Sequence, residues 1–200
     1  MNRHAISAID LCYGSTKIAT TDLGGNLQLS NSPLRAIQAN ELDFNNCSPE
    51  ALELHRVDVN GVSYLVGSDI HQLQHTHSMR IAHFDFVNTS EYIALFKGAL
   101  TSIGTDHIGL LIVGLPVNMV NKLGGKLQKK FQGTHHISGN KTVCVDKVEV
   151  LAQPIAGMID YAFSIDSYET IKDQVTLVIA PGYFTLDWVV AKGLNIYPNR

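Results

Sequence analysis

A short pattern of residues occurs twice in this chain, once near its beginning and once near its end. Residues 8–13 match residues 178–183. In each segment an apolar run is followed by two further residues, a small residue and a tyrosine, after which a second apolar run begins. Ser15 in the first copy then corresponds to Thr185 in the second. Strand, tight turn and strand indicate a β-hairpin. One fold unit used twice explains the match.

Phosphate binding is the chemistry that suits two such hairpins. A tight turn of small residues exposes backbone N–H groups, which can surround an anion together with serine and threonine hydroxyls. Two hairpins that face each other can clamp a polyphosphate from both sides. Asp10, at the end of a strand, could hold Mg²⁺ through water, and Lys17 could meet a phosphate or point to solvent. The alternative is that both hairpins are structural and bind no ligand.

Strands and helices alternate between the two hairpins, which predicts the α/β class with a mixed sheet. Asn60-Gly61, between two apolar runs, is a strong hairpin-turn signal, and Ser90 can cap a helix. Hydrophobic spacing predicts further strands over residues 56–60, 62–66, 107–115 and 141–150, and helices over 90–103, part of 117–132 and 153–161. Residues 40–49 are polar and predict a loop, and residues 166–173 predict a loop or the end of a helix.

Charge and hydropathy argue against several classes of protein. The 18 acidic and 15 basic residues give a net charge of −3, which leaves no electrostatic footprint for nucleic acid or anionic lipid. The longest apolar stretch, residues 108–115, is too short to cross a bilayer, and no signal peptide opens the chain. The three cysteines lack metal-like spacing, which favours a reducing compartment. We therefore expect a cytoplasmic protein with no direct contact to nucleic acid or membrane.

The histidines suggest a second hypothesis, a zinc site. His71 and His75 would share one face of a helix, with His77 close by, and could chelate Zn²⁺. A zinc site normally needs three or four protein ligands, and no cysteine or carboxylate cluster completes this set. A polar loop is therefore the favoured interpretation. His135 and His136 follow a glycine and are interpreted as turn residues.

Residues 10–17 resemble the first phosphate loop of the actin/Hsp70/sugar-kinase superfamily. The resemblance is greatest to the bacterial actin-like plasmid-segregation proteins of the ParM/StbA type. Further blocks are similar to that family and occur in the same order, namely residues 64–67, 92–100, 114–117, 148–154 and, as the second phosphate loop, 182–187.

The resemblance implies a fold, a cofactor and partners. It implies an actin-like ATPase (ribonuclease H-like) domain over residues 1–165 and the opening hairpin of a second, similar and truncated domain over 166–200. ATP and Mg²⁺ would bind in the cleft. The protein would self-associate into filaments, and an adaptor protein bound to plasmid DNA would be its partner.

The resemblance also assigns roles to individual residues. Asp10 would be the carboxylate on the Mg²⁺ side and a catalytic residue, and Gln153 would orient the attacking water. The other nucleotide contacts would come from Tyr13, Gly14, Ser15, Thr16 and Lys17 in the first loop and from Gly182, Tyr183, Phe184 and Thr185 in the second.

The sequence departs from the family pattern at three places. Cys12 stands where the family has glycine, and its Cβ makes a left-handed turn or a close approach to phosphate harder. Ala180 stands where the family has aspartate, a loss that should impair hydrolysis more than binding. The chain also ends before most of a second domain, which should leave Phe184, Trp188 and Val190 poorly covered.

These departures keep more than one function open. We expect weak nucleotide affinity and impaired hydrolysis in an actin-like, filament-forming protein. The alternative is a non-catalytic actin-like scaffold or interaction module, such as a filament cap or regulator. A sugar or acetate kinase, which shares the phosphate loops, is the third possibility, and no substrate-domain signal of such a kinase is recognisable.

Overall fold

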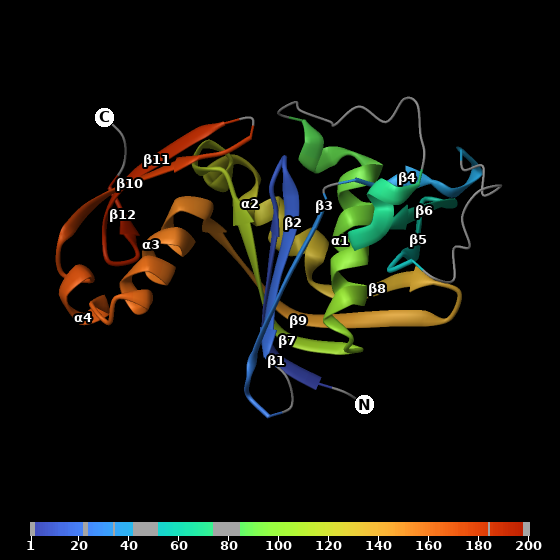
Figure 1. Cartoon of the computed structure of the whole chain (residues 1–200), viewed down its shortest axis with the longest axis horizontal. Helices are drawn as coiled ribbons and strands as arrows, with labels where there is room; N and C mark the ends of the chain where they lie inside the picture. Colours follow the sequence, from blue (N-terminus) through green and yellow to red (C-terminus); the bar gives the residue numbers. More distant parts are fainter. Residues whose placement is uncertain are drawn as a thin grey trace.

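A six-stranded mixed sheet forms the centre of the molecule, with its strands in the order β3-β2-β1-β7-β9-β8 (Figure 1). The computed structural model describes residues 3–21, 24–33, 35–41, 52–73, 85–183 and 185–197. The strands of this sheet are β1 (Arg3–Leu11), β2 (Ser15–Thr21), β3 (Leu27–Pro33), β7 (His107–Leu115), β8 (Gly133–Ser138) and β9 (Lys141–Ala152). β2 runs antiparallel to β1 and β3, whereas β7 lies parallel to both β1 and β9. The predicted α/β class with a mixed sheet is confirmed.

Two helices cover one face of this sheet, α1 (Ser90–Ile103) and α2 (Val117–Phe131). The rings of Phe96 in α1 and Phe131 in α2 stack with their centroids 3.7 Å apart. Leu111 of β7 and Val148 of β9 are fully buried in the same cluster. Since parallel strands need crossover connections, the helices that make those connections also bury the apolar face of the sheet.

A three-stranded sheet of order β4-β6-β5 packs against α1. Its turn residues Asn60 and Gly61 have φ angles of 51° and 82°, the left-handed values that a two-residue hairpin loop of this kind requires. The predicted Asn60-Gly61 hairpin is therefore confirmed. Its strands and the neighbouring 3-10 helices are β4 (Ile37–Gln38), β5 (His55–Val59), β6 (Val62–Val66), η1 (Ala39–Glu41), η3 (Ser68–Gln72) and η4 (Phe86–Asn88).

The C-terminal part of the chain forms a separate sheet that packs on α3 (Gln153–Ser164), to one side of the central sheet in Figure 1. Met158 and Val189 are buried where the two meet. The other face of this sheet is open, with Trp188 47% exposed as expected, while Val190 is half-buried. Its strands, with a one-turn helix before them, are β10 (Val175–Pro181), β11 (Leu186–Lys192), β12 (Asn195–Ile196) and α4 (Tyr168–Ile171). The domain division at residues 165 and 166 stays a prediction.

Some local expectations were wrong. Thr89, not Ser90, caps α1, and its hydroxyl accepts a hydrogen bond from the backbone N–H of Tyr92 at 3.2 Å. His135 and His136 lie in strand β8 rather than in a turn, and the ring of His135 donates to the carbonyl oxygen of Phe131 at 2.7 Å. Strand β3 escaped prediction because it is a polar edge strand whose first five residues are all exposed.

Other expectations fall partly outside the described residues. The undescribed residues include His75 and His77 of the zinc hypothesis. They also include most of the predicted polar loop at 40–49. His71 sits in the short 3-10 helix η3. Within the described part of the chain, no helix has both the length and the apolar character that a membrane span requires.

Gly98 in α1 generates a stability prediction. A Cβ at this position would lie 2.2 Å from Cγ2 of Val66, so Gly98→Ala overpacks the contact between α1 and β6. Alanine favours a helix by about 1 kcal/mol over glycine, but overpacking costs about 1–3 kcal/mol, so we expect net destabilisation in urea unfolding. Gly125→Ala in α2, where nothing lies within 4 Å, should instead be stabilised. A Gly98→Ala variant as stable as the wild type would contradict the packing.

Candidate functional site

The two hairpins predicted from the repeated pattern have the same register. In the first, Asp10 lies opposite Lys17, and in the second, Ala180 lies opposite Asp187. The same turn hydrogen bond closes each loop. The backbone N–H of Cys12 donates to the carbonyl oxygen of Ser15 at 3.0 Å, and that of Gly182 donates to the carbonyl oxygen of Thr185 at 2.8 Å. The predicted repeat is thus confirmed at the level of single backbone groups.

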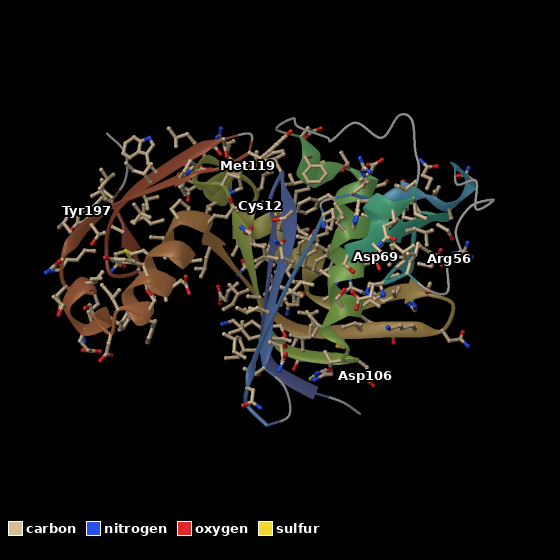
Figure 2. All side chains as sticks on the ribbon, viewed as in Figure 1. Cys12, Arg56, Asp69, Asp106, Met119 and Tyr197 are labelled. Atoms are coloured by element: carbon tan, nitrogen blue, oxygen red, sulfur yellow. The ribbon has the colours of Figure 1, made fainter. Side chains whose placement is uncertain are left out.

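The two loops face each other across a cleft of about 530 Å³. They approach closely, since a Cβ at Gly14 would lie 3.6 Å from the Cβ of Tyr183. Both hairpins contribute to the lining, as do the start of α2 and the inner side of α3, through Met119 and Asp160 among others. Figure 2 shows Cys12 and Met119 at this end of the central sheet. The cleft therefore lies between the central sheet and the C-terminal sheet.

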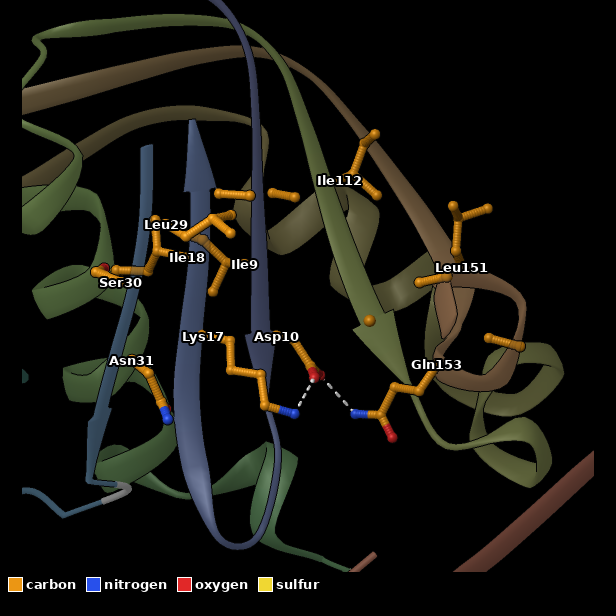
Figure 3. A pocket seen from close by; sticks show the side chains of 15 residues that line it. Ile9, Asp10, Lys17, Ile18, Leu29, Ser30, Asn31, Ile112, Leu151 and Gln153 are labelled. Carbon is orange, nitrogen blue, oxygen red and sulfur yellow. Dashed lines mark hydrogen bonds and ion pairs between the residues drawn. The ribbon is translucent and has the colours of Figure 1, made fainter. Parts of the chain in front are cut away.

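Asp10 is the centre of the polar groups in this cleft. The side-chain N–H of Gln153 (Nε2) donates to Asp10 Oδ1 at 2.7 Å, and the ammonium of Lys17 lies 3.7 Å from Asp10 Oδ2 (Figure 3). The Asp10 side chain keeps 28% of its surface exposed. Asp10 is the last residue but one of β1, and Gln153 begins α3 directly after β9, so the carboxyl ends of parallel strands bring them together. Three of the predicted site residues thus meet at one point.

Gly114 on β7 makes room for this contact. It is the register partner of Asp10, and a Cβ there would lie 2.9 Å from Asp10 Oδ1 and 3.1 Å from Cγ of Gln153. Any larger residue would push the carboxylate and the amide apart. Gly114 was not among the residues predicted for the site. Its signal was a glycine inside an otherwise apolar strand, which often marks a close approach.

Cys12 is accommodated without backbone strain. Among the described residues other than glycine, positive φ angles occur at Asn60 and Asp166, so the first loop needs no left-handed turn at Cys12 and the expected backbone difficulty does not arise. The expected hindrance to a close approach of phosphate stays a prediction. Its thiol donates to Asp10 Oδ2 at 2.7 Å. Burial, followed by the charge of Asp10 and this hydrogen bond, raises the pKa of Cys12 to about 12. The thiol is therefore a neutral donor that occupies one oxygen of Asp10.

Asp187 ties the second hairpin to α2. Its Oδ1 accepts from the backbone N–H of Val117 at 3.1 Å, and its Oδ2 accepts from the hydroxyl of Thr185 at 2.8 Å. Because Ala180 and Asp187 are cross-strand partners, their side chains share one face of the hairpin. Asp187 lies within the predicted second loop, but no role was predicted for it.

The remaining predicted residues differ in their access to the cleft. Tyr13 lines it and is buried against Phe86, and burial together with the charge of Asp187 raises the pKa of its hydroxyl. Thr16 is only 3% exposed, and its side chain lines a small hollow under α1, away from the cleft. Gly182, Tyr183 and Thr185 line the opposite wall, Gly14 and Ser15 are half-buried in the first loop, and Phe184 lies outside the described residues.

A second hollow adjoins the cleft on the sheet face that α1 and α2 do not cover. It measures about 400 Å³ and shares Asp10, Lys17 and Gln153 with the cleft (Figure 3). Away from these polar groups its walls are mostly aliphatic, with Leu29 and Ile112 among the lining residues, and Ser30 and Asn31 are polar exceptions. Asp10 thus stands between a polar cleft and an apolar surface.

The environment of Cys12 generates a reactivity prediction. In a Cys47→Ser, Cys144→Ser background, we expect iodoacetamide to alkylate Cys12 more than about a hundredfold more slowly in the folded protein than in urea at pH ~9, because only the thiolate reacts. Asp10→Asn should accelerate the reaction, since it removes a charge that raises the pKa of Cys12. Equal rates in folded and unfolded protein would contradict the raised pKa of Cys12, and an unchanged rate in Asp10→Asn would contradict the contribution of Asp10.

Comparisons with solved structures show which fold this is. The apo ParM protein of pSK41 aligns with a TM-score of 0.69 and 15% identity, over 98% of this chain and 64% of that one. A non-polymerisable quadruple mutant of pCBH ParM aligns with a TM-score of 0.68 and 19% identity, over 94% and 58%. Ta0583, an archaeal actin homologue in complex with ADP, aligns with a TM-score of 0.61 and 14% identity, over 98% and 58%.

The match to a protein family extends over most of the chain. This chain spans 58–64% of the length of the three structures. Because its sequence identity to them is only 14–19%, the likeness is one of fold. A search of curated proteins finds no match. The family described as actin-like proteins, N-terminal domain, matches residues 8–155, which include the first loop, Gly114 and Gln153. The chain therefore belongs to the actin-like proteins and contains their N-terminal domain.

Proposed function

We propose that the cleft between the two hairpins binds Mg²⁺-ATP, and that the chain acts as an actin-like, filament-forming protein of plasmid segregation. The observation that carries this proposal is the meeting of Asp10, Lys17 and Gln153 at a cleft whose opposite wall is a second hairpin of the same register. A clamp of this kind suits a polyphosphate, which both loops can contact.

The residues present fit such a ligand. A volume of about 530 Å³ lies within the usual range of roughly 300–1,000 Å³ for small-molecule sites. Mg²⁺ is commonly held by one or two carboxylates with several waters and substrate phosphates, and Asp10 is a partly exposed carboxylate in the right place. Lys17 lines the cleft and supplies a cation that a phosphate could attract away from Asp10.

Gln153 has one end of its amide available for a water molecule. Its Nε2 donates to Asp10, whereas its Oε1 points away from the carboxylate (Figure 3). A carbonyl oxygen accepts hydrogen bonds and can orient a water for attack on a phosphate. The bond to Asp10 fixes the amide, so we assign Gln153 the water-positioning role and Asp10 the Mg²⁺-side role. The other contacts would come from Tyr13, Gly14 and Ser15 in the first loop and from Gly182, Tyr183 and Thr185 in the second, whereas Thr16 faces away from the cleft.

The absence of a carboxylate at position 180 should impair ATP hydrolysis more than nucleotide binding. Ala180 provides no carboxylate, and the carboxylate directly across the hairpin, Asp187, is held by Val117 and Thr185. The second wall therefore retains its shape and its loop but lacks a free acid to help organise a cation or water. In this proposal the nucleotide is bound and turned over slowly.

Filament formation, an adaptor bound to plasmid DNA and a cytoplasmic location belong to the same proposal. They are supported by the family and by relatives that include ParM proteins, one described as a non-polymerisable mutant, and an archaeal actin homologue with ADP. The second candidate is a non-catalytic actin-like scaffold. The engagement of both oxygens of Asp10 by Gln153 and Cys12 favours it.

Ala180→Asp tests the proposed impairment. We expect calorimetry to detect Mg²⁺-ATP binding by the wild type. The variant should gain ATP hydrolysis, or assembly that a light-scattering assay detects. Asp10→Asn should weaken binding at least about tenfold, corresponding to about 1.4 kcal/mol, whereas Asp173→Asn, an exposed control, should not. Absence of binding in the wild type and in Ala180→Asp would refute the nucleotide site and leave the scaffold.

Gly114→Ala tests the contact between Asp10 and Gln153. The added methyl group displaces the flexible end of Asp10 rather than backbone, so we expect at least about tenfold weaker Mg²⁺-ATP binding with little change in the melting temperature. Gly125→Ala is the matched control, because its Cβ enters open space. Unchanged affinity in Gly114→Ala would show that the position of the carboxylate is unimportant.

A further inference from the structure

We propose that His107, Cys144 and Asp146 form a binding site for a divalent transition-metal cation of the zinc type. One ligand atom from each residue, an imidazole nitrogen, Sγ and a carboxylate oxygen, lies within 4.8 Å of the other two. His107 is the first residue of β7, and Cys144 and Asp146 lie in the first half of β9. Neither the zinc hypothesis on the histidines at 71–77 nor the proposed nucleotide site includes them.

The backbone of two paired strands fixes the positions of these residues. His107 and Cys144 are register partners in the parallel pairing of β7 with β9. Cys144 and Asp146 are two residues apart on one strand and therefore share a face of the sheet. The backbone N–H of Cys144 also donates to the carbonyl oxygen of Asp106 at 2.9 Å. This bond holds β9 beside the residue that precedes β7.

One pair of ligands is already in contact. His107 Nε2 and Asp146 Oδ1 share a hydrogen bond of 2.8 Å. Ligand bonds to zinc of about 2.0–2.3 Å place neighbouring ligand atoms roughly 3.5 Å apart in a tetrahedron. Small side-chain rotations therefore convert this cluster into three ligands. The cation would take the place of the hydrogen between nitrogen and oxygen. The Nε2 proton would leave to solvent while Nδ1 takes one up, so that the ring binds as the neutral Nδ1–H tautomer, and the thiol would release its proton to solvent.

The donor set selects the kind of cation. Thiolate and imidazole are ligands of zinc and related transition metals, whereas Mg²⁺ and Ca²⁺ take oxygen ligands. Three protein ligands leave a fourth position for water, as in zinc sites with an open position. The side chains of His107 and Asp146 are 18% and 44% exposed, so a cation can reach them from solvent.

The site is remote from the cleft. Gly114 and Gln153 lie at the carboxyl ends of β7 and β9, whereas His107 and Cys144 lie near the beginnings of the same strands. In Figure 2, Asp106, next to His107 in sequence, lies at the opposite end of the sheet from Cys12. A bound cation would cross-link β7 to β9 without touching the nucleotide site.

Titration of the untagged chain with Co²⁺ tests this proposal. We expect thiolate-to-cobalt charge-transfer absorption that saturates at one equivalent and disappears when Zn²⁺ is added. Cys144→Ser should abolish this absorption, and Cys12→Ser, the matched control, should retain it. Asp146→Asn, a change on a partly exposed side chain, should fold and bind at least about tenfold more weakly, a loss that even supporting residues of metal sites produce.

Two results would overturn the site. One is a wild-type chain without charge-transfer absorption, and the other is an absorption that survives Cys144→Ser or vanishes in Cys12→Ser. Thermal unfolding gives a second readout, because a cation that binds only the folded chain raises its melting temperature. Zn²⁺ should do so for the wild type and for Cys12→Ser, and not for Cys144→Ser.

Discussion

The parallel pairing of β1, β7 and β9 is the constraint on which the rest of the structure depends. Parallel strands cannot be joined by tight turns, so long connections carrying α1 and α2 must cross one face of the sheet, where they bury its apolar side chains. The same pairing places all three carboxyl ends at one edge. Asp10, Gly114 and Gln153 are brought into contact there, and the strand beginnings gather His107 and Cys144 at the other edge.

The two hairpins present different chemistry on the same backbone. In the first, a carboxylate faces a lysine across the strands, and Cys12 and Gln153 hold it in place. In the second, the carboxylate is on the other strand, opposite an alanine, and it accepts a hydrogen bond from the N-terminus of α2. The first hairpin can therefore contact a ligand with charged side chains, whereas the second contributes mainly the shape of the wall and its backbone groups. This asymmetry is the physical basis for proposing binding with slow turnover.

Much of the fold could be predicted because its signals are local. Apolar spacing located β7, α1 and most of β9, and Asn60-Gly61 located a hairpin. The failures have equally physical causes. Strand β3 needs no apolar face at the sheet edge, β8 is defined by its pairing with β9, and either Thr89 or Ser90 had a suitable hydroxyl for the cap.

The sequence by itself determined the repeated hairpins and the α/β class, because these are carried by short motifs and by periodicity. Asp10 and Lys17 were candidates because they lie in the first hairpin, and Gln153 was a candidate through the resemblance to the actin-like proteins. Only the tertiary structure decided what those residues touch. Asp10 meets Gln153 across 143 positions, Val117 meets Asp187 across 70, and His107 meets Asp146 across 39. Contacts at such separations depend on strand order and register, which are decided by the packing of the whole sheet and not by neighbouring residues.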